Sequence, residues 1–232
     1  MDQQKFDEAL NLHYEDRFDE AAVIFKALAE QGHAGAQLKL GEYYFFGRAF
    51  PQDPAAAVEW IRKSAEQGNA EAQVRLGILH SSGRGVQRDE VKAVEWYNKA
   101  AAQGDEEGQF YLGESYYHGR GVGKNHAKAV EWFFKSAEQG NAIAQQHVGE
   151  CYHFGYGVEK SEEKAVEWTS KSAEQGYAEA QTILGFCYLM GAGIQQDGAK
   201  AIEWMIKAAE QGHEDAIAFL KKIQEESESG GE

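Results

Sequence analysis

The amino-acid sequence predicts an all-α fold in which antiparallel helix pairs stack into an α-solenoid. Tetrads of the AEQG type recur every 36 residues, and their final glycines are Gly32, Gly68, Gly104, Gly140, Gly176 and Gly212. A Glu-Trp dipeptide has the same period and contains all five tryptophans, Trp60, Trp96, Trp132, Trp168 and Trp204. Small residues also recur where helix backbones must approach closely, at Ala36, Ala72, Gly108, Ala144 and Ala180. One helix pair cannot bury its own apolar face, so the pairs are expected to stack.

The period divides the chain into five full units with a shorter segment on either side. The units are residues 33–68, 69–104, 105–140, 141–176 and 177–212. Residues 1–32 are expected to form a helix pair before them, and residues 213–224 a capping helix after them. The acidic, Ser- and Gly-containing tail, residues 225–232, is expected to be disordered.

Each unit is predicted to begin with a helix that ends at a glycine. In the third unit, Asp105 can cap a helix of about 14 residues that ends at Gly119. The equivalent glycines are Gly47, Gly83, Gly155 and Gly191. Glycine accepts the left-handed backbone that commonly closes a helix, so five first helices are expected.

A loop then leads to a second helix, which ends at the final glycine of the unit. The residues predicted to cap its start are Asp53, Asp89, Asn125, Ser161 and Asp197, all favoured N-cap types. Pro54 stands at the first helical position of the first unit, where its missing N–H is not needed. In the loop of this unit Ala49 replaces the glycine found in the later units, so a different loop path is expected.

The tryptophans are interpreted as packing residues. One indole per unit is spread evenly along the array, whereas a ligand cage would need several aromatic rings at one point. The Glu–Lys pairs four residues apart in the same helices, such as Glu131 and Lys135, are interpreted as exposed scaffolding.

Composition and charge exclude several classes of partner. With 23 basic and 38 acidic side chains, the net charge of −15 would repel nucleic acid and anionic lipid. No run of 18 apolar residues is present to cross a bilayer, so no membrane is expected as partner. The opening residues have neither the basic region nor the apolar core of a signal peptide, which predicts a cytoplasmic protein.

The cysteines and histidines do not predict an active site. Cys151 and Cys187 stand at equivalent places in adjacent units, farther apart than a disulfide allows, so two free thiols are expected. His147 and Cys151 share a helical face, but His153 lies on another, and no spacing typical of a zinc site occurs. We therefore expect no metal, no cofactor and no catalytic residue.

The repeated pattern A-x-x-x-L-G-x-x-Y-x-x-G-x-G-V, followed by K-A-x-x-W-x-x-K-A-A-E-Q-G, resembles the Sel-1-like repeat. This family belongs to the tetratricopeptide superfamily, and the resemblance covers Ala36 to about Gly212. Residues 1–32 lack the longer loop and resemble an ordinary tetratricopeptide unit. The resemblance implies a right-handed superhelix and an adaptor role, with a partner segment held on a concave face formed by the first helices. A disulfide-rich branch of the family has a cysteine pair in every repeat, so its activities are not transferred to this chain.

Transferring that geometry selects the residues that would line the concave face. The candidate binding residues are Glu42, Phe45, Phe46, Phe110, Glu114, Tyr117, His118, Glu150, His153, Phe154, Phe186, Leu189 and Met190. The selected positions contain no Lys or Arg, which favours a basic and apolar peptide segment of another protein as the partner. Glu42, Glu114 and Glu150 would pair with its cations. The alternative is that some of these aromatic residues pack between neighbouring first helices.

The leading hypothesis is therefore a non-enzymatic adaptor or scaffold. A second hypothesis is a structural protein that forms a weak homodimer through the C-terminal helix, whose apolar stripe contains Ile217, Leu220 and Ile223. A third and weaker one is a thiol- or metal-dependent enzyme around His147 and Cys151.

Overall fold

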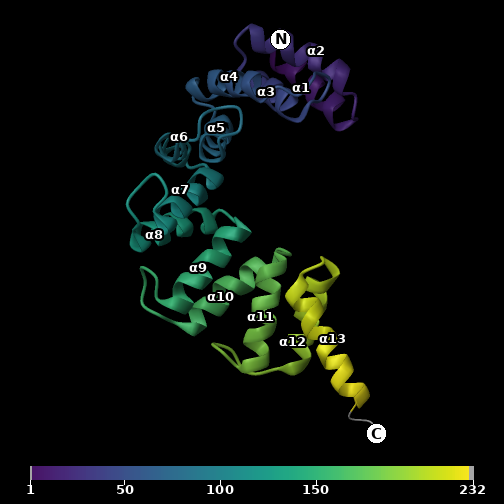
Figure 1. Cartoon of the computed structure of the whole chain (residues 1–232), viewed down its shortest axis with the longest axis vertical. Helices are drawn as coiled ribbons and strands as arrows, with labels where there is room; N and C mark the ends of the chain where they lie inside the picture. Colours follow the sequence, from purple (N-terminus) through teal and green to yellow (C-terminus); the bar gives the residue numbers. More distant parts are fainter. Residues whose placement is uncertain (1, 230–232) are drawn as a thin grey trace. The chain divides into compact units, whose positions relative to one another are not determined.

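The computed structural model describes residues 2–229, and this range contains thirteen α-helices and no strand (Figure 1). The helices are α1 (Asp2–Tyr14), α2 (Phe18–Glu30), α3 (Ala34–Phe46), α4 (Pro54–Glu66), α5 (Ala70–Ser82), α6 (Glu90–Ala102), α7 (Glu106–His118), α8 (His126–Glu138), α9 (Ala142–Phe154), α10 (Glu162–Glu174), α11 (Ala178–Met190), α12 (Gly198–Glu210) and α13 (Glu214–Ser229). Two helices fall in each 36-residue unit, as the sequence predicts.

The chain forms two compact units, Met1–Lys124 and Asn125–Glu232. Within the first, each helix from α1 to α7 packs against the next, and α5 also contacts α7. Within the second, each helix from α8 to α13 packs against the next. This helix-on-helix stacking is the predicted all-α solenoid.

The helix ends follow the predicted capping residues. The side chain of Asp53 accepts hydrogen bonds from the backbone N–H groups of Ala55 and Ala56 at the start of α4. Asp89 and Asn125 cap α6 and α8 in the same way. Each first helix ends at a left-handed glycine, such as Gly83 with φ of 72°. Local sequence therefore determines where these helices begin and end.

The loop that contains Ala49 differs from the expectation. Ala49 has φ of 58°, the same left-handed conformation as Gly85 in the next loop. The reason is the closing hydrogen bonds: Arg48 N–H donates to Tyr43 O at 2.9 Å, as Arg84 N–H donates to Leu79 O at 3.3 Å. The prediction of a different loop path is wrong, because these bonds hold the alanine in a conformation that glycine would adopt more easily.

The tryptophans are half-buried and lie one per repeat, as the packing interpretation requires. Trp60 packs against the core cluster that includes Phe25, Leu40 and Tyr43. A lysine ammonium lies 3.6–4.0 Å from each ring centroid, in the pairs Lys63–Trp60, Lys99–Trp96, Lys135–Trp132, Lys171–Trp168 and Lys207–Trp204. Each ring is thus covered by a lysine of its own helix, as expected for a packing residue.

Buried glutamines link successive helix pairs, a feature that was not predicted from the sequence. Gln73 Nε2 donates to Ala65 O at 3.0 Å, and its Oε1 accepts from Gln103 Nε2 at 2.8 Å. The same arrangement recurs around Gln37, Gln145 and Gln181. The glutamine of the AEQG tetrad is therefore a hydrogen-bond donor to the first helix of its own repeat.

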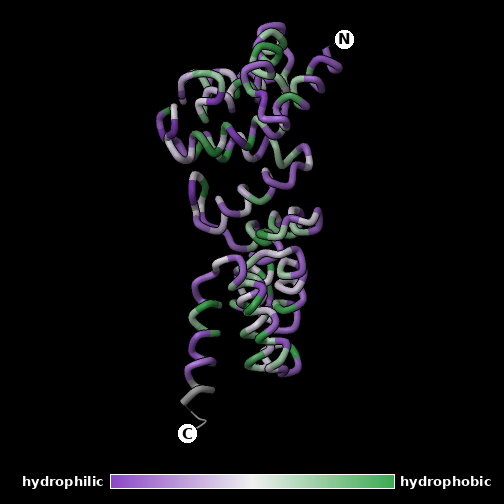
Figure 2. Tube along the Cα trace, turned by 90° about the vertical axis from the view of Figure 1, so that its right-hand side faces the viewer, coloured by the Kyte–Doolittle hydropathy of each residue, from purple (hydrophilic) through white to green (hydrophobic). Residues whose placement is uncertain are grey.

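The last helix caps the array and is longer than predicted. Phe219 and Leu220 of α13 pack against the cluster of Met205, Ala208 and Ala216, and Figure 2 shows hydrophobic and hydrophilic residues alternating along this helix. The helix continues to Ser229 instead of ending at residue 224, because no glycine or proline interrupts it before Gly230. The end of the predicted disordered tail, residues 230–232, lies outside the described residues.

Candidate functional site

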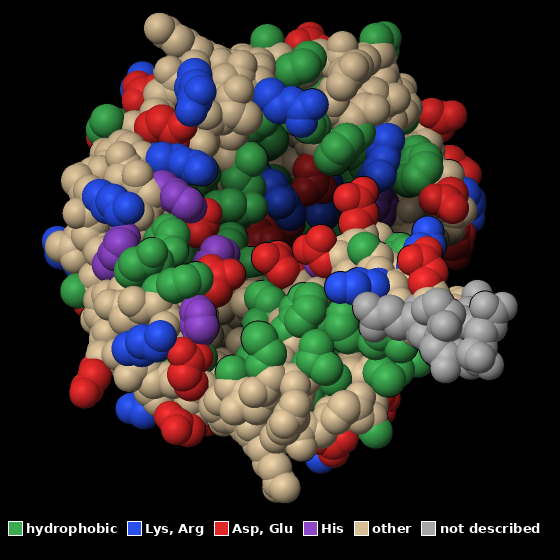
Figure 3. Space-filling view, turned by 60° about the horizontal axis from the view of Figure 1, so that its bottom comes forward, with side chains coloured by type: hydrophobic (Ala, Val, Ile, Leu, Met, Phe, Trp, Pro, Cys, Tyr) green, Lys and Arg blue, Asp and Glu red, His purple; other side chains and the backbone are tan. Residues whose placement is uncertain are grey.

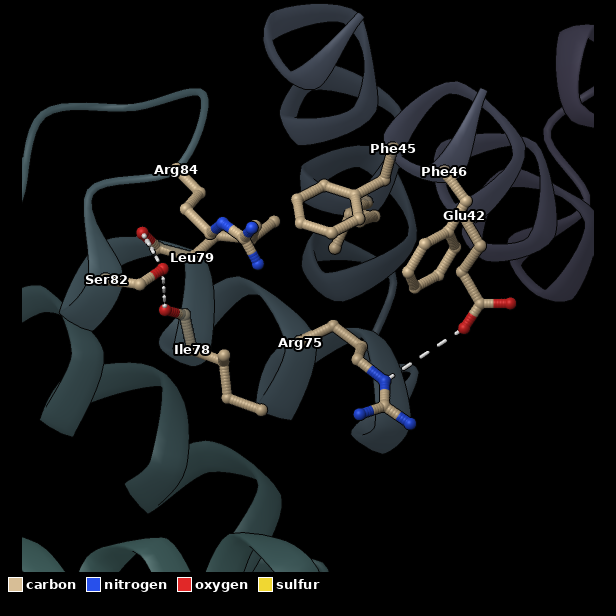
Figure 4. A pocket seen from close by; sticks show the side chains of 9 residues that line it. Glu42, Phe45, Phe46, Arg75, Ile78, Leu79, Ser82 and Arg84 are labelled. Atoms are coloured by element: carbon tan, nitrogen blue, oxygen red, sulfur yellow. Dashed lines mark hydrogen bonds and ion pairs between the residues drawn. The ribbon is translucent and has the colours of Figure 1, made fainter. Parts of the chain in front are cut away.

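A cavity of about 320 Å³ lies between the first helices of the first and second repeats, α3 and α5 (Figure 4). Its lining residues are Glu42, Phe45, Phe46, Ile61, Arg75, Ile78, Leu79, Ser82 and Arg84. Three of them, Glu42, Phe45 and Phe46, are candidates from the sequence. The helix periodicity brings these three side chains to one end of α3, where they meet residues of α4, α5 and the following loop.

A second cavity, of about 160 Å³, lies one repeat further along the same compact unit. It is lined by Ile78, Ser81, Ser82, Glu90, Tyr97, Tyr111, Glu114, Ser115 and Arg120. It shares Ile78 and Ser82 with the first cavity, so the two adjoin along α5.

A third cavity, of about 310 Å³, lies in the other compact unit between α9 and α11. Its lining residues are Gln146, Gly149, Glu150, His153, Phe154, Glu162, Ala165, Val166, Thr169, Ile183 and Cys187. It contains the candidates Glu150, His153 and Phe154.

The three cavities occupy the same place in the repeat. Glu42, Ile78 and Glu150 are separated by whole multiples of the 36-residue period, as are the lining residues Ile61, Tyr97 and Thr169 from the second helices. The fold therefore builds the same hollow between successive repeats, and the side chains that line it differ. The third cavity contains the acidic Glu150 and Glu162 together with His153. The first cavity contains two phenylalanines and two arginines.

The first cavity contains positive charge, which the candidate positions from the sequence lack. Arg84 lies over the ring of Phe45, with 5.3 Å from Cζ to the ring centroid, and Arg75 Nε lies 4.0 Å from Glu42 Oε1 (Figure 4). Lys39 Nζ lies 2.9 Å from the other oxygen of Glu42. The expectation of a face without Lys or Arg is therefore wrong here. Arg75 reaches in from the next first helix and Arg84 from a loop, and neither position was among those selected.

The acidic candidates already have partners within the chain. Glu42 is held by Lys39 and Arg75, and Glu114 Oε2 lies 3.5 Å from His118 Nε2. In the third cavity, Glu150 Oε2 lies 3.3 Å from His147 Nδ1. Burial raises the pKa of the Glu150 carboxyl, but the hydrogen bond and charge of His147 together with a hydrogen bond from Gln146 outweigh it, and the net pKa is below its ordinary value.

The aromatic candidates divide into exposed and packed groups. Phe46, Phe154 and Met190 occupy the same place in three repeats and are 61%, 57% and 67% exposed. Figure 3 shows hydrophobic side chains exposed beside acidic, basic and histidine side chains on the face that it presents. Phe186 instead packs edge-on against Phe219 of α13, with 5.6 Å between ring centroids.

The remaining candidates lie on α7 and α11. Phe110 contacts Tyr111 and Tyr117 contacts His118, with ring centroids 5.3 and 5.0 Å apart. Leu189 is half-buried and lines none of the three cavities.

The cysteines are free, as expected, and are not activated as nucleophiles. Burial raises the pKa of the Cys151 thiol to about 12 and raises that of Cys187 as well. His153 Nδ1 lies 2.7 Å from Glu162 Oε2, and the ring of His147 stacks on Phe133. Among the described side chains, those of residues 2–225, no three His, Cys, Asp or Glu residues are grouped so that they could hold a metal ion. Over the same range, no helix is long and apolar enough to span a membrane.

Comparison with solved structures gives two close matches. The Sel1 repeat protein from Oxalobacter formigenes is 32% identical, with a TM-score of 0.87 over 94% of this chain and 87% of that one. The protective antigen c5321 of uropathogenic Escherichia coli, which displays an SLR fold, is 35% identical, with a TM-score of 0.86 over 97% of this chain. The alignment covers 50% of the E. coli chain, so the present chain spans about half of that protein.

A more distant structure, the immunity protein Pa5087 from Pseudomonas aeruginosa, is 20% identical with a TM-score of 0.59, over 92% of this chain and 83% of that one, and supports the fold alone. No curated protein matches the sequence. The Sel1 repeat family matches in five consecutive segments, residues 34–69, 70–105, 106–141, 142–177 and 178–213, each displaced by one residue from the units read from the period. The chain therefore belongs to the Sel1 repeat family.

Proposed function

We propose that the chain is a non-enzymatic scaffold that binds a peptide segment of a partner protein along the cavities between successive first helices. The observation that carries this proposal is the recurrence of one hollow at the same place in different repeats, lined by exposed apolar and charged side chains. Exposed apolar groups beside charged ones are typical of surfaces that bind other proteins.

The apolar side chains at the ends of the first helices are suited to anchor such a segment. Phe46, Phe154 and Met190 are more than half exposed, so their apolar area is still available for burial by a partner. A few well-buried aromatic anchors carry most of the affinity in many protein interfaces. Methionine adds a flexible contact that can adapt to different side chains.

The charge that a partner must carry differs between cavities. In the third cavity, His153 and Lys160 already neutralise Glu162, but Glu150 lies beside His147, which is charged only when protonated, so Glu150 supports the basic segment that the sequence favours. In the first cavity, Lys39 and Arg75 already neutralise Glu42, so this carboxylate is not a free partner for a cation.

The proposal can be tested by capturing a partner from a lysate of the source organism. The test variant changes Phe46, Phe154 and Met190 to Ser, and the matched control changes Tyr14, Val23 and Val91 to Ser, three exposed apolar residues that line none of these cavities. Unchanged circular dichroism would establish that both variants fold. We expect the test variant to lose a partner that the control retains, with affinity lower by about tenfold or more. Equal retention by both variants would refute binding at the cavities.

One observation favours self-assembly as a second candidate function. Val58, Val94, Val130 and Val166 stand at one place in four repeats and are at most 6% exposed, whereas Ile202 at the same place in the last repeat is 39% exposed. The neighbouring Ile206 is 43% exposed. The helix α13 packs on Met205 and Ala208 through Phe219 and Leu220, and Ile202 and Ile206 of α12 stay exposed, so a second copy could pack there with Ile217 and Ile223 of α13.

Light scattering over a concentration series tests this candidate. If the chain self-associates, its measured mass should rise with concentration above the monomer mass of 25.8 kDa. The mass of a variant with Ile202→Glu and Ile206→Glu should stay at the monomer value. A constant mass for the unmodified chain would rule out the homodimer and leave the partner-binding proposal intact.

A further inference from the structure

Three arginines occupy one place in three successive repeats of the first compact unit. Arg48, Arg84 and Arg120 each follow the glycine that ends a first helix, and in the fourth and fifth repeats this place holds Tyr156 and Ala192. The backbone N–H of each arginine donates to the carbonyl oxygen of Tyr43, Leu79 or Ser115, at 2.9, 3.3 and 2.9 Å. The three side chains therefore leave the backbone at equivalent points.

Among the side chains of residues 2–225, these arginines have no carboxylate partner, and all three are exposed. Each of the other four arginines of the chain, Arg17, Arg62, Arg75 and Arg88, lies within 4.0 Å of a glutamate oxygen. In a protein with a net charge of −15, three arginines in one register without such a pair are unusual. They are available to bind an anion.

The same arginines lie beside the apolar parts of the cavities. Arg84 lines the first cavity over the ring of Phe45 (Figure 4). Arg120 lines the second cavity with Tyr97 and Tyr111. Arg48 lies over the ring of Phe46, with 5.3 Å from Cζ to the ring centroid. Each guanidinium is thus paired with an apolar surface that could receive a neighbouring side chain of the same ligand.

We propose that this row of arginines binds an acidic, apolar stretch of a partner protein across the first and second cavities. Carboxylates of the partner meet the guanidinium groups of Arg48, Arg84 and Arg120, and apolar side chains between them enter the cavities. The planar guanidinium suits a carboxylate because it can donate two parallel hydrogen bonds. Nucleic acid is a poorer occupant because it carries a charge at every phosphate and has no apolar side chains that could enter the cavities. This inference rests on the proposed function and names the partner chemistry at these cavities.

Fluorescence anisotropy of the full chain with three labelled peptides tests the proposal. The probes are four repeats of Leu-Asp-Gly, of Leu-Lys-Gly and of Ser-Asp-Gly, which separate the contributions of acid and of the apolar side chain. We expect the Leu-Asp-Gly peptide to bind most tightly, and its affinity to fall as the salt concentration is raised. Preference for the Leu-Lys-Gly peptide would overturn the acidic assignment while leaving the proposed scaffold function in place. If the Ser-Asp-Gly peptide bound as tightly as the Leu-Asp-Gly peptide, the role of apolar side chains in the cavities would be overturned. No binding of any peptide would overturn this inference, while the lysate capture would still test the proposed function separately.

A charge-matched pair of variants identifies the arginines responsible. The test variant changes Arg48, Arg84 and Arg120 to Gln, and the control changes Arg62, Arg88 and Lys92 to Gln, three cations that line none of these cavities. We expect about tenfold weaker binding of the Leu-Asp-Gly peptide by the test variant, and a change of less than about twofold by the control. Equal losses would overturn the row of arginines as the site.

Discussion

Single residues in this chain often serve two neighbours at once. Lys135 Nζ lies 3.1 Å from Glu131 Oε1 and also 3.9 Å from the ring centroid of Trp132. The same double contact occurs around Trp168 and Trp204. A cation over an exposed indole contributes about 0.5–1 kcal/mol, so each lysine covers the outer face of a tryptophan whose inner face packs on the core.

Replacing Ala49 by Gly should stabilise the first repeat. Ala49 has φ of 58°, where a residue with a Cβ costs about 1 kcal/mol relative to glycine. We expect the free energy of unfolding in urea to rise by about 0.5–1 kcal/mol.

The reciprocal variant Gly85→Ala serves as the control for Ala49. A Cβ at Gly85 would overlap the backbone oxygen of Pro54, and φ there is 74°, so this variant should be destabilised by about 2 kcal/mol or more. If both changes moved stability in the same direction, the strain at Ala49 would not be the cause.

His80 should make the protein sensitive to mild acid. Burial, together with the charge of Lys92, lowers the pKa of His80 below its ordinary value of 6.5, and its Nδ1 has no hydrogen-bond partner. Below about pH 6.5 the unfolded chain takes up a proton that the folded protein resists, so stability falls as the pH falls toward the folded pKa.

The variant His80→Tyr should lose part of this acid sensitivity. Tyrosine occupies the same place in the other four repeats, at Tyr44, Tyr116, Tyr152 and Tyr188, so the change should fit the fold. Urea unfolding midpoints at pH 7.5 and 5.5 would measure the acid sensitivity. If the midpoint fell as much in the variant as in the unmodified chain, His80 would be excluded as the cause.

At the scale of helices, the stack is held by contacts that repeat with the period. On α3, α5, α9 and α11, a buried glutamine accepts from the AEQG glutamine of its own repeat and donates to the preceding second helix, as Gln73 does with Gln103 and Ala65. Such bonds fix the distance and register between helices, because a buried amide without partners would cost free energy.

Replacing Gln73 by Ala should therefore loosen the contact among α4, α5 and α6. The change leaves the buried carbonyl of Ala65 without its side-chain donor, and we expect a loss of about 1–3 kcal/mol in the free energy of unfolding. Gln87→Ala, at an exposed loop position, should change it by less than about 0.5 kcal/mol. A double-mutant cycle with Gln103→Ala should give a coupling energy clearly different from zero, and additive losses would count against the paired arrangement.

The helices could be predicted from the sequence, and the cavities could not. Capping residues such as Asp53 and closing glycines such as Gly83 act over a few residues, so their effect can be read locally. The first cavity combines α3, α4, α5 and a loop, and the contribution of Arg84 depends on where that loop returns. Ala49 shows the same limit, because hydrogen bonds formed on folding determine its conformation.

For the whole molecule, net charge is the dominant long-range property. With 38 acidic against 23 basic side chains, the folded chain repels itself more than the expanded unfolded chain does. Salt screens this repulsion, with a Debye length of about 10 Å at 0.1 M ionic strength.

Stability should therefore increase as salt is raised. We expect the Tm in 200 mM sodium chloride to exceed that in 20 mM by a few degrees. Sodium sulfate would act through surface exclusion as well, so chloride is the appropriate salt. A Tm that fell with added chloride would mean that attractive ion pairs outweigh the excess of negative charge.

On α5, most residues that hold the stack together differ from those that line the cavities, and Leu79 does both. On α5, Ala72, Gln73 and Leu76 are buried in the stack, whereas Ile78, Ser81 and Ser82 face the cavities. Substitution of Ile78, Ser81 or Ser82 therefore leaves the buried contacts of Ala72, Gln73 and Leu76 in place. Ligand preference can thus evolve, or be engineered, one repeat at a time, and duplication of a repeat would add a recognition position without the need for a new fold.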